Sequence, residues 1–347
     1  MRAVRNFIQT LIALFAMIVF YQELDRERNY KRILVLRPGD AAPMPIDARL
    51  SGIVIAYKND VLIADQVAPR RTVSTKEFKY VKHDLGEGFT LPDNKIGRKS
   101  EANKVEFTGT METDLCEDYG LEDVIPQDDI DNAPAGDDPE GRAVEGIANY
   151  NDLNREKRVS DLIFNTNSYA AGNQEQLAGT TQFSAFTTSD PITKLNDALD
   201  SMVMRGNIIV FGQKAWSYTR RHPDIVSAVL GNSGTKGMVS KQQFADLFEI
   251  DEVLVGPAWL NTAKKGQTPV LSRVWGNHIS ILCRDVLADL TNRVTFALTA
   301  QFGDKVAYRD FNNRIGLKGA VIVKAGDSVK ELVTAKDLGY LFQDAVA

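Results

Sequence analysis

The chain has 347 residues, of which 44% are hydrophobic and 25% are charged. These values are typical of globular proteins and argue against disorder throughout, and the length predicts one large domain or two intertwined domains. The formal net charge of -5 argues against a surface that grips nucleic acid by neutralising many phosphates. The two cysteines, Cys116 and Cys283, have no cysteine or histidine nearby at metal-ligand spacing, so we expect reduced thiols in a cytosolic protein.

A strongly apolar run at residues 7–21 follows Arg2 and Arg5, which is the order found in signal peptides and membrane anchors. The run is shorter than the ~20 residues that a spanning helix needs, and no small-residue cleavage site follows it directly. An amphipathic arm used in assembly is the competing interpretation. The marginal length makes the anchor the weaker of the two.

Residues 76–83 and 104–111 alternate polar and apolar residues, as amphipathic strands do. Phe78 and Tyr80 share one face of the first strand, and Phe107 lies on the apolar face of the second. The long tip between them is rich in glycine and carries three basic residues, Lys95, Arg98 and Lys99. Because such a hairpin is not stable alone in water, we expect it to lie against another surface.

The next segment is strongly acidic: residues 112–140 contain twelve aspartates and glutamates and no lysine or arginine. A solvated acidic loop is the common meaning of such a run, and an acidic docking surface for a basic partner is the alternative. Calcium binding is disfavoured because the spacing does not match an EF-hand.

Apolar residues at helical steps on both sides of a polar middle predict one helix of more than twenty residues, at about 141–166. The polar middle, residues 151–157, is expected to be exposed while both ends are buried. Residues 170–189, rich in Gly, Thr, Ser and Gln, are expected to form a linker.

Residues 190–260 are predicted to form a helix, a strand, further helices and a second strand. We expect strands at 207–212 and 252–256, and helices from Ile192 and Gln213. Asp224 and Ser240 are candidate N-caps for the next two helices, since both side chains accept backbone N–H groups. These residues supply apolar faces, caps and turns, which build a core and not a catalytic centre.

A series of short strands is predicted beyond residue 260, at 270–275, 278–283, 294–298, 306–308, 320–323 and 331–334. Few long helices separate these strands, so the pattern does not support a doubly wound parallel sheet. The predicted fold class is α+β.

No catalytic, cofactor or metal site is predicted. The three histidines, His83, His222 and His278, show neither metal-pair spacing nor the order of a catalytic triad. Residues 231–237 lack the phosphate-loop pattern and do not follow a strand, so a turn is expected. The tryptophans are expected to be core or interface anchors: Trp216, Trp259 and Trp275.

Several segments, in this order, carry a resemblance to a known family: LSGIVIAYKNDVLIADQVAPRRTV, SDPITKLNDALDSM, NIIVFGQKAWSYTRRHPDIVSAV, SKQQFADLFEIDEVLVGPAWLNTA and VWGNHISILC. The series resembles the major capsid (head) proteins of tailed bacteriophages, in a group similar to the lambda-like head proteins. The resemblance runs from about Met44 onward. Members of the family begin near there, so residues 1–43 could instead be a translated upstream stretch.

The resemblance implies the Hong Kong 97-like fold. Its parts would be an N-terminal arm at 44–71, an extended loop at 72–112, a peripheral domain at 113–188 and 293–335 containing the spine helix, an axial domain at 189–292, and a C-terminal segment at 336–347. The loop would lie across an adjacent subunit, which makes six residues inter-subunit contact candidates: Phe78, Tyr80, Lys95, Arg98, Lys99 and Phe107.

The implied function is assembly of pentamers and hexamers into an icosahedral phage head around double-stranded DNA, bound without sequence specificity. No enzymatic activity is expected. Scaffold, portal and decoration proteins are the further partners that the family implies, and the virion and the host cytoplasm are the implied locations. Two rivals stay open: a membrane-anchored or exported globular protein, and an enzyme that uses residues 207–256 to bind a nucleotide.

Overall fold

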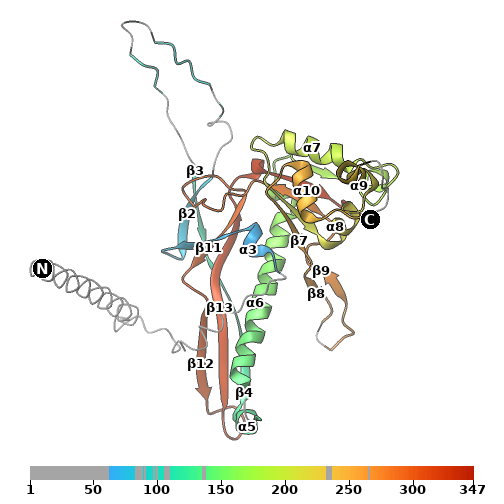
Figure 1. The fold of residues 1–347 in the computed structure, drawn as a ribbon. Coiled ribbons are helices and arrows are strands. Elements are labelled where there is room, and N and C mark those ends of the chain that lie inside the picture. Colours follow the sequence, from blue (N-terminus) through green and yellow to red (C-terminus); the bar gives the residue numbers. More distant parts are fainter. Residues whose placement is uncertain are drawn as a thin grey trace, which may run out of the picture. The chain divides into compact units, whose positions relative to one another are not determined.

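The computed structural model describes residues 62–82, 89, 91–96, 98, 101–104, 110–134, 138–231, 237–264 and 266–347. The predictions for residues 1–61, including the apolar run and most of the arm, lie outside this part, as do those for His83, Lys99 and Phe107. Within it, no helix is long and apolar enough to cross a membrane. The described residues form two five-stranded sheets, and Figure 1 shows a long helix beside the first of them.

The first sheet is organised around β13 (Ala320–Val333), a strand of 14 residues. On one edge β13 pairs with β12 (Val306–Asn312) and then with β11 (Ala297–Phe302), and β11 also pairs with β1 (Arg70–Val73). On its other edge β13 pairs with β4 (Glu117–Pro126). The sequence pattern predicted two strands here, which is wrong, because the glycine and polar residues in the middle of β13 interrupt the apolar pattern but not the pairing.

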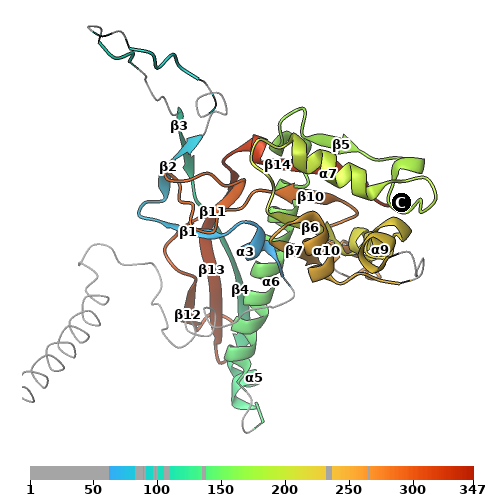
Figure 2. The same ribbon diagram turned by 45° about the horizontal axis from the view of Figure 1, so that its top comes forward.

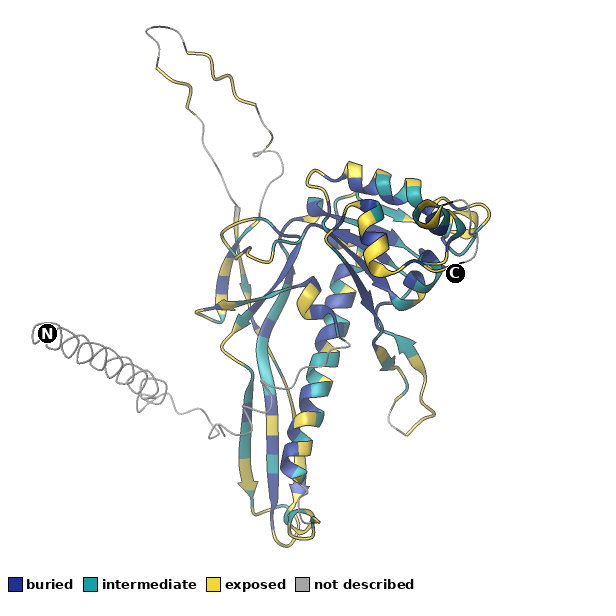
Figure 3. Ribbon diagram, viewed as in Figure 1, coloured by how far each residue is buried: buried dark blue, intermediate teal, exposed yellow. Residues whose placement is uncertain are grey.

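The helix α6 (Pro139–Ile163) has 25 residues and packs along β13 and β4 (Figure 1). It begins where Asp138 accepts a hydrogen bond from the Gly141 amide and where Pro139 occupies the first turn. The predicted long helix is therefore confirmed, with its start and end shifted by up to three residues. The prediction of an exposed middle is wrong, because Arg155 and Glu156 are buried there. Figure 3 shows buried and partly buried stretches along the long helix.

The second sheet has the strand order β5 (Gln174–Gln176), β14 (Gly339–Gln343), β10 (Ile279–Leu282), β6 (Ile208–Gly212) and β7 (Glu252–Gly256). Pairs β6–β7 and β5–β14 are parallel and the others antiparallel, so the sheet is mixed. One face is covered by the helices α7 (Pro191–Ser201), α8 (Gln213–Thr219), α9 (Pro223–Leu230) and α10 (Lys241–Phe248). Figure 2 shows α7, α9 and α10 beside the strands.

The sequence patterns between residues 190 and 256 predicted most of the helices and strands in that range. Asp190 caps α7, and Ser240 caps α10 in a reciprocal arrangement with Gln243. The predicted cap at Asp224 is wrong, since the His222 ring accepts the Asp224 amide and α9 begins at the proline between them. The predicted linker at 170–189 is also wrong, because Phe183 is fully buried in the core beneath these helices.

Two smaller hairpins complete the fold. β2 (Glu77–Lys82) pairs with β3 (Thr110–Leu115), and β8 (Trp259–Asn261) pairs with β9 (Leu271–Arg273). The second strand of the first hairpin was predicted at 104–111; residues 105–109 lie outside the described residues, and β3 covers Thr110–Leu115.

Candidate assembly surfaces

The base of the β2–β3 hairpin is held by its own chain. Phe78 and Tyr80 lie on one face of β2, as predicted, and are 5% and 9% exposed. They pack in a cluster with Cys116, which lies between β3 and β4, and with residues of β1, β11 and β13: Val73, Leu298, Ala300 and Leu332. The Tyr80 hydroxyl also donates to Glu112 at 2.6 Å. Most of both side chains is therefore covered within one subunit, and the contact to a neighbour that the resemblance implies for them stays a prediction.

The described part of the loop beyond the hairpin base is exposed to solvent, unlike the base itself. Lys95 and Arg98 are exposed, and among the residues that the structure describes neither forms an ion pair. Leu91 and Ile96 beside them are 95% and 55% exposed. The described part of this loop therefore presents positive charge together with uncovered apolar side chains.

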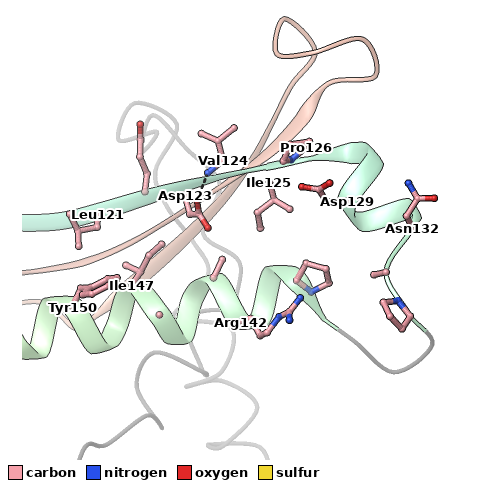
Figure 4. A pocket seen from close by; sticks show the side chains of 16 residues that line it. Leu121, Asp123, Val124, Ile125, Pro126, Asp129, Asn132, Arg142, Ile147 and Tyr150 are labelled. Carbon is pink, nitrogen blue, oxygen red and sulfur yellow. Dashed lines mark hydrogen bonds between the residues drawn. The ribbon is translucent and has the colours of Figure 1, made fainter. Parts of the chain in front are cut away.

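The acidic run is not a loop. Most of it forms β4 and the short helix α5 (Gln127–Asp131), and β4 pairs only with β13 among the described strands, so its other edge is open. Between β4 and α6 lies a groove of ≈ 870 Å³, with residues from both elements and from the segment after α5 in its walls (Figure 4).

The groove combines apolar and acidic groups. Leu121, Val124 and Tyr150 are 39%, 41% and 64% exposed, which leaves apolar surface uncovered along it. Asp123 and Asp129 line it and form no ion pair within the described residues. Other acids of the run are already paired in the chain: Asp114 and Glu117 with Lys330, Asp118 with Lys76, and Asp128 with Lys318.

Glu156 fixes the start of the described chain to the middle of α6. Its carboxylate, fully buried, accepts the amides of Ile63 and Ala64 at 2.8 to 3.1 Å and the Trp275 indole N–H at 2.6 Å. Burial raises the pKa of the Glu156 carboxyl above its ordinary value, although these N–H donors act in the opposite direction. The carboxylate thereby satisfies the first amides of the short helix α3 (Ala64–Val67).

Arg155, next to it, joins the same segment to the first sheet. Its guanidinium bonds the Ala68 carbonyl and the Thr299 hydroxyl at 3.1 and 3.0 Å, and it pairs with Asp65 at 2.6 Å. Burial acts to raise the pKa of Asp65, but Arg155 and Arg70 together hold it below its ordinary value. Sequence reasoning missed this cluster, because a charged pair in the middle of a polar stretch looks like a solvated face.

A serine, a histidine and an aspartate lie close together at the start of α9, but they cannot act as a catalytic triad. Ser189 Oγ lies 3.1 Å from Nε2 of His222, which is fully buried. Nδ1 of His222 accepts the Asp224 amide, so the ring proton is on Nε2 and donates to the serine. A general base would need the reverse tautomer. Ser189 in turn donates to the Ala185 carbonyl at 2.9 Å, which makes the group a structural tie.

His278 and the three tryptophans considered in the sequence analysis also make structural contacts. His278 accepts the Asp344 amide at 3.0 Å, and Trp216 and Trp275 are buried. Trp259 is 50% exposed and stacks beneath Arg273. In the part of the chain that the structure describes, no group of three or more His, Cys, Asp or Glu side chains could hold a metal ion.

Comparison with known proteins gives a consistent result. No family model matches the chain. The "Major capsid protein" of Pseudomonas phage JBD67 is 50% identical over 306 residues, which are 88% of this chain and 99% of that protein. The "Major capsid protein" of Burkholderia phage BcepMu is 28% identical over 240 residues, 67% of this chain and 75% of that protein.

Solved structures agree at the level of the fold. A phage-related protein from Bordetella bronchiseptica superposes with a TM-score of 0.67 at 20% identity, over 88% of this chain and 98% of that one. The mature capsid of bacteriophage PhiM1 gives a TM-score of 0.52 at 11% identity, over 89% and 91% of the two chains. The curated relatives are shell proteins and not enzymes, and they favour a capsid function over a membrane-anchored one. The chain belongs to the family of bacteriophage major capsid proteins.

Proposed function

We propose that copies of this chain form the pentamers and hexamers of an icosahedral head that encloses double-stranded DNA. Assembly would take place in the host cytoplasm, with scaffold, portal and decoration proteins as further partners. The DNA would be enclosed without sequence-specific contacts, which is in keeping with a net charge of -5 and an acidic surface strand.

The loop beyond the β2–β3 hairpin is the proposed link between neighbouring subunits. Its basic residues Lys95 and Arg98, together with Lys99 outside the described part, would meet the acidic groove of the next subunit. The observation that carries this proposal is the complementarity of two exposed surfaces of one chain, one basic and apolar, the other acidic and apolar. Complementary charge would set the register of the contact, and burial of the apolar side chains would supply most of its free energy.

The division into parts follows the same proposal. The arm at 44–71 and the extended loop at 72–112 would reach outward, and α6 would be the spine of a peripheral domain at 113–188 and 293–335. The axial domain at 189–292 would be completed by residues 336–347, because β14 lies between β5 and β10 in the second sheet.

Charge reversal tests the loop contact. We expect Lys95→Glu, Arg98→Glu and Lys99→Glu together to impair shell formation in sedimentation and negative-stain electron microscopy, while the circular dichroism of the subunit stays unchanged. A matched control reverses two exposed lysines and one exposed arginine elsewhere, Lys214, Lys336 and Arg314. Normal shells from the loop variant, or equal loss in the control, would contradict loop docking.

A further inference from the structure

The β8–β9 hairpin leaves apolar side chains uncovered. Its strands pair with each other and, among the described residues, with no other strand. The hairpin follows the edge strand β7, and Figure 1 shows it extending past the end of that strand. Trp259, Val270 and Leu271 are 50%, 59% and 62% exposed. Because a two-stranded hairpin is at best marginally stable in water, these side chains favour a further contact.

The hairpin is also positively charged. Residues 253–284 contain no aspartate or glutamate, whereas Lys264 and Arg273 lie within the hairpin and form no ion pair with another described residue. The Arg273 guanidinium lies 3.8 Å from the centre of the Trp259 ring and covers one face of it. That face is not open to a nucleic acid base, and the aliphatic side chains beside it suit a protein surface better. The hairpin therefore fits an acidic and apolar protein partner.

Such a surface lies at the other end of β7, around the end of α10. Three exposed acids there form no ion pair within the described residues: Asp246, Glu249 and Asp251. The segment before β6 lies beside them, because the Asn207 carbonyl accepts the Asp251 amide at 2.9 Å. In this segment Val203 and Met204 are 42% and 43% exposed, and Arg205 is already paired with Asp200. The three acids and the two apolar residues are called the α10 patch below.

The hairpin and the α10 patch are too far apart to meet within one subunit. The acids of the patch precede β7 (Glu252–Gly256) and the hairpin follows it, so the length of the strand separates them. At ~3.3 Å per residue, five strand residues span roughly 16 Å. Two different surfaces that complement each other join copies head to tail, and such contacts close into rings.

We propose that the β8–β9 hairpin of one subunit binds the α10 patch of the next subunit around the same ring. The two basic side chains of the hairpin face the three acids, while Trp259 and Leu271 cover Val203 and Met204. This inference rests on the proposed function, because it names the contact that joins subunits within a pentamer or hexamer. It uses neither the extended loop nor the groove beside β4.

Reciprocal charge reversal in the full chain tests the contact. Lys264→Glu with Gln267→Glu, both exposed, leaves the stack of Arg273 on tryptophan intact. This variant should need about tenfold more protein to assemble in sedimentation, because like charges then face each other. The reversed patch should show the same loss: Asp246→Lys, Glu249→Lys and Asp251→Lys. Both sets combined should assemble near the wild-type concentration, with the circular dichroism of the subunit unchanged throughout.

A matched control combines the reversed hairpin with three reversed acids elsewhere, all exposed, and should not recover assembly: Glu145→Lys, Asp304→Lys and Asp310→Lys. Cross-linking gives a second measurement. Leu271→Cys and Met204→Cys in one chain, treated with a short bis-maleimide reagent, should give a ladder of denatured chains that ends at pentamers or hexamers. Each single-cysteine variant should stay monomeric after denaturation, since the native cysteines are both buried.

The failure of this contact is distinguishable from the failure of the proposed function. Wild-type protein that never assembles would overturn both. Wild-type shells together with normal assembly of the reversed hairpin, no recovery in the combined variant, or no cross-linked ladder would overturn the hairpin contact alone. So would a reversed hairpin that assembles normally but loses binding to a DNA duplex in fluorescence anisotropy, because the hairpin would then contact nucleic acid.

Discussion

The indole N–H of Trp275 and the carboxylate of Glu156 form a 2.6 Å hydrogen bond inside the protein. The same carboxylate holds the amides of Ile63 and Ala64, so one buried side chain joins α6, the segment after β9 and the start of α3. The bond therefore fixes Ile63, at the start of the described chain, against α6.

Glu156→Gln should therefore destabilise the subunit. The amide group of glutamine would place a donor against N–H donors, and leaving buried groups without partners costs about 2 to 3 kcal/mol. The measurement is the free energy of unfolding of the dissociated subunit in urea. Asp161→Asn, on the exposed side of the same helix, should change it by less than about 0.5 kcal/mol. Equal stability of Glu156→Gln and wild type would show that α3 is not held by this carboxylate.

Phe78→Ala should loosen the hairpin base from the first sheet. Removing a buried phenylalanine typically costs about 3 to 5 kcal/mol, and the neighbours that lose contact are Leu298 and Leu332. The exposed Met111, on the paired strand, serves as the control and should tolerate alanine with little effect. Thermal unfolding that is unaffected by Phe78→Ala would mean that this side chain is free for a neighbouring subunit after all.

Gly326 and Gly146 should respond in opposite directions to alanine. A Cβ at Gly326 would lie 2.3 Å from the Tyr119 carbonyl oxygen, where β13 pairs with β4, so Gly326→Ala should destabilise the subunit by about 1 to 3 kcal/mol. A Cβ at Gly146, in α6, meets nothing within 4 Å, and the alanine should stabilise the helix by about 0.5 to 1 kcal/mol. Urea unfolding of both variants checks the two predictions. A Gly326→Ala protein as stable as wild type would contradict the close approach of β13 to β4.

Stability should fall as the pH is lowered below neutrality. Burial holds the pKa of His222 below its ordinary 6.5, so the unfolded chain takes up a proton before the folded one does. The contribution of neutral His222 is present above pH 6.5 and is lost as the pH falls toward the lower pKa of the folded state. His278 behaves in the same way, because burial also lowers its pKa.

The check is the unfolding free energy of the dissociated subunit between pH 7.5 and 5.5. In His222→Gln the slope with pH should be smaller than in wild type, although the protein is less stable overall. An unchanged slope in the variants of both histidines would assign the pH dependence to other groups.

Local patterns predicted β6, β7 and β10 of the second sheet and the helices that cover it, but not its strands β5 and β14. The continuous apolar runs of β6 and β7, the spacing along α7 and the cap at Ser240 each depend on neighbours in the sequence, whereas the cap at Asp190 was not predicted. That is why these elements lie within one or two residues of their predicted positions. The long helix α6 was found for the same reason.

Strand pairing between residues far apart in the sequence could not be predicted from local patterns. The middle of β13 reads as polar, yet it is a strand because β12 and β4 pair with it from both sides. The acidic residues of β4 read as a loop for the same reason. From the sequence alone Arg155 and Glu156 are expected to be solvated, because the segment that starts at Ile63 and covers them is distant in sequence. Phe78 is expected to lack a partner for the same reason, since its contacts to the first sheet are long-range.

Negative-stain electron microscopy of the expressed full-length protein tests the central claim most directly. If the chain is a shell-forming subunit, particles should be closed shells of uniform diameter, or capsomers that close when other head proteins are added. A protein that stays a monomer at high concentration, alone and with those partners, would contradict it.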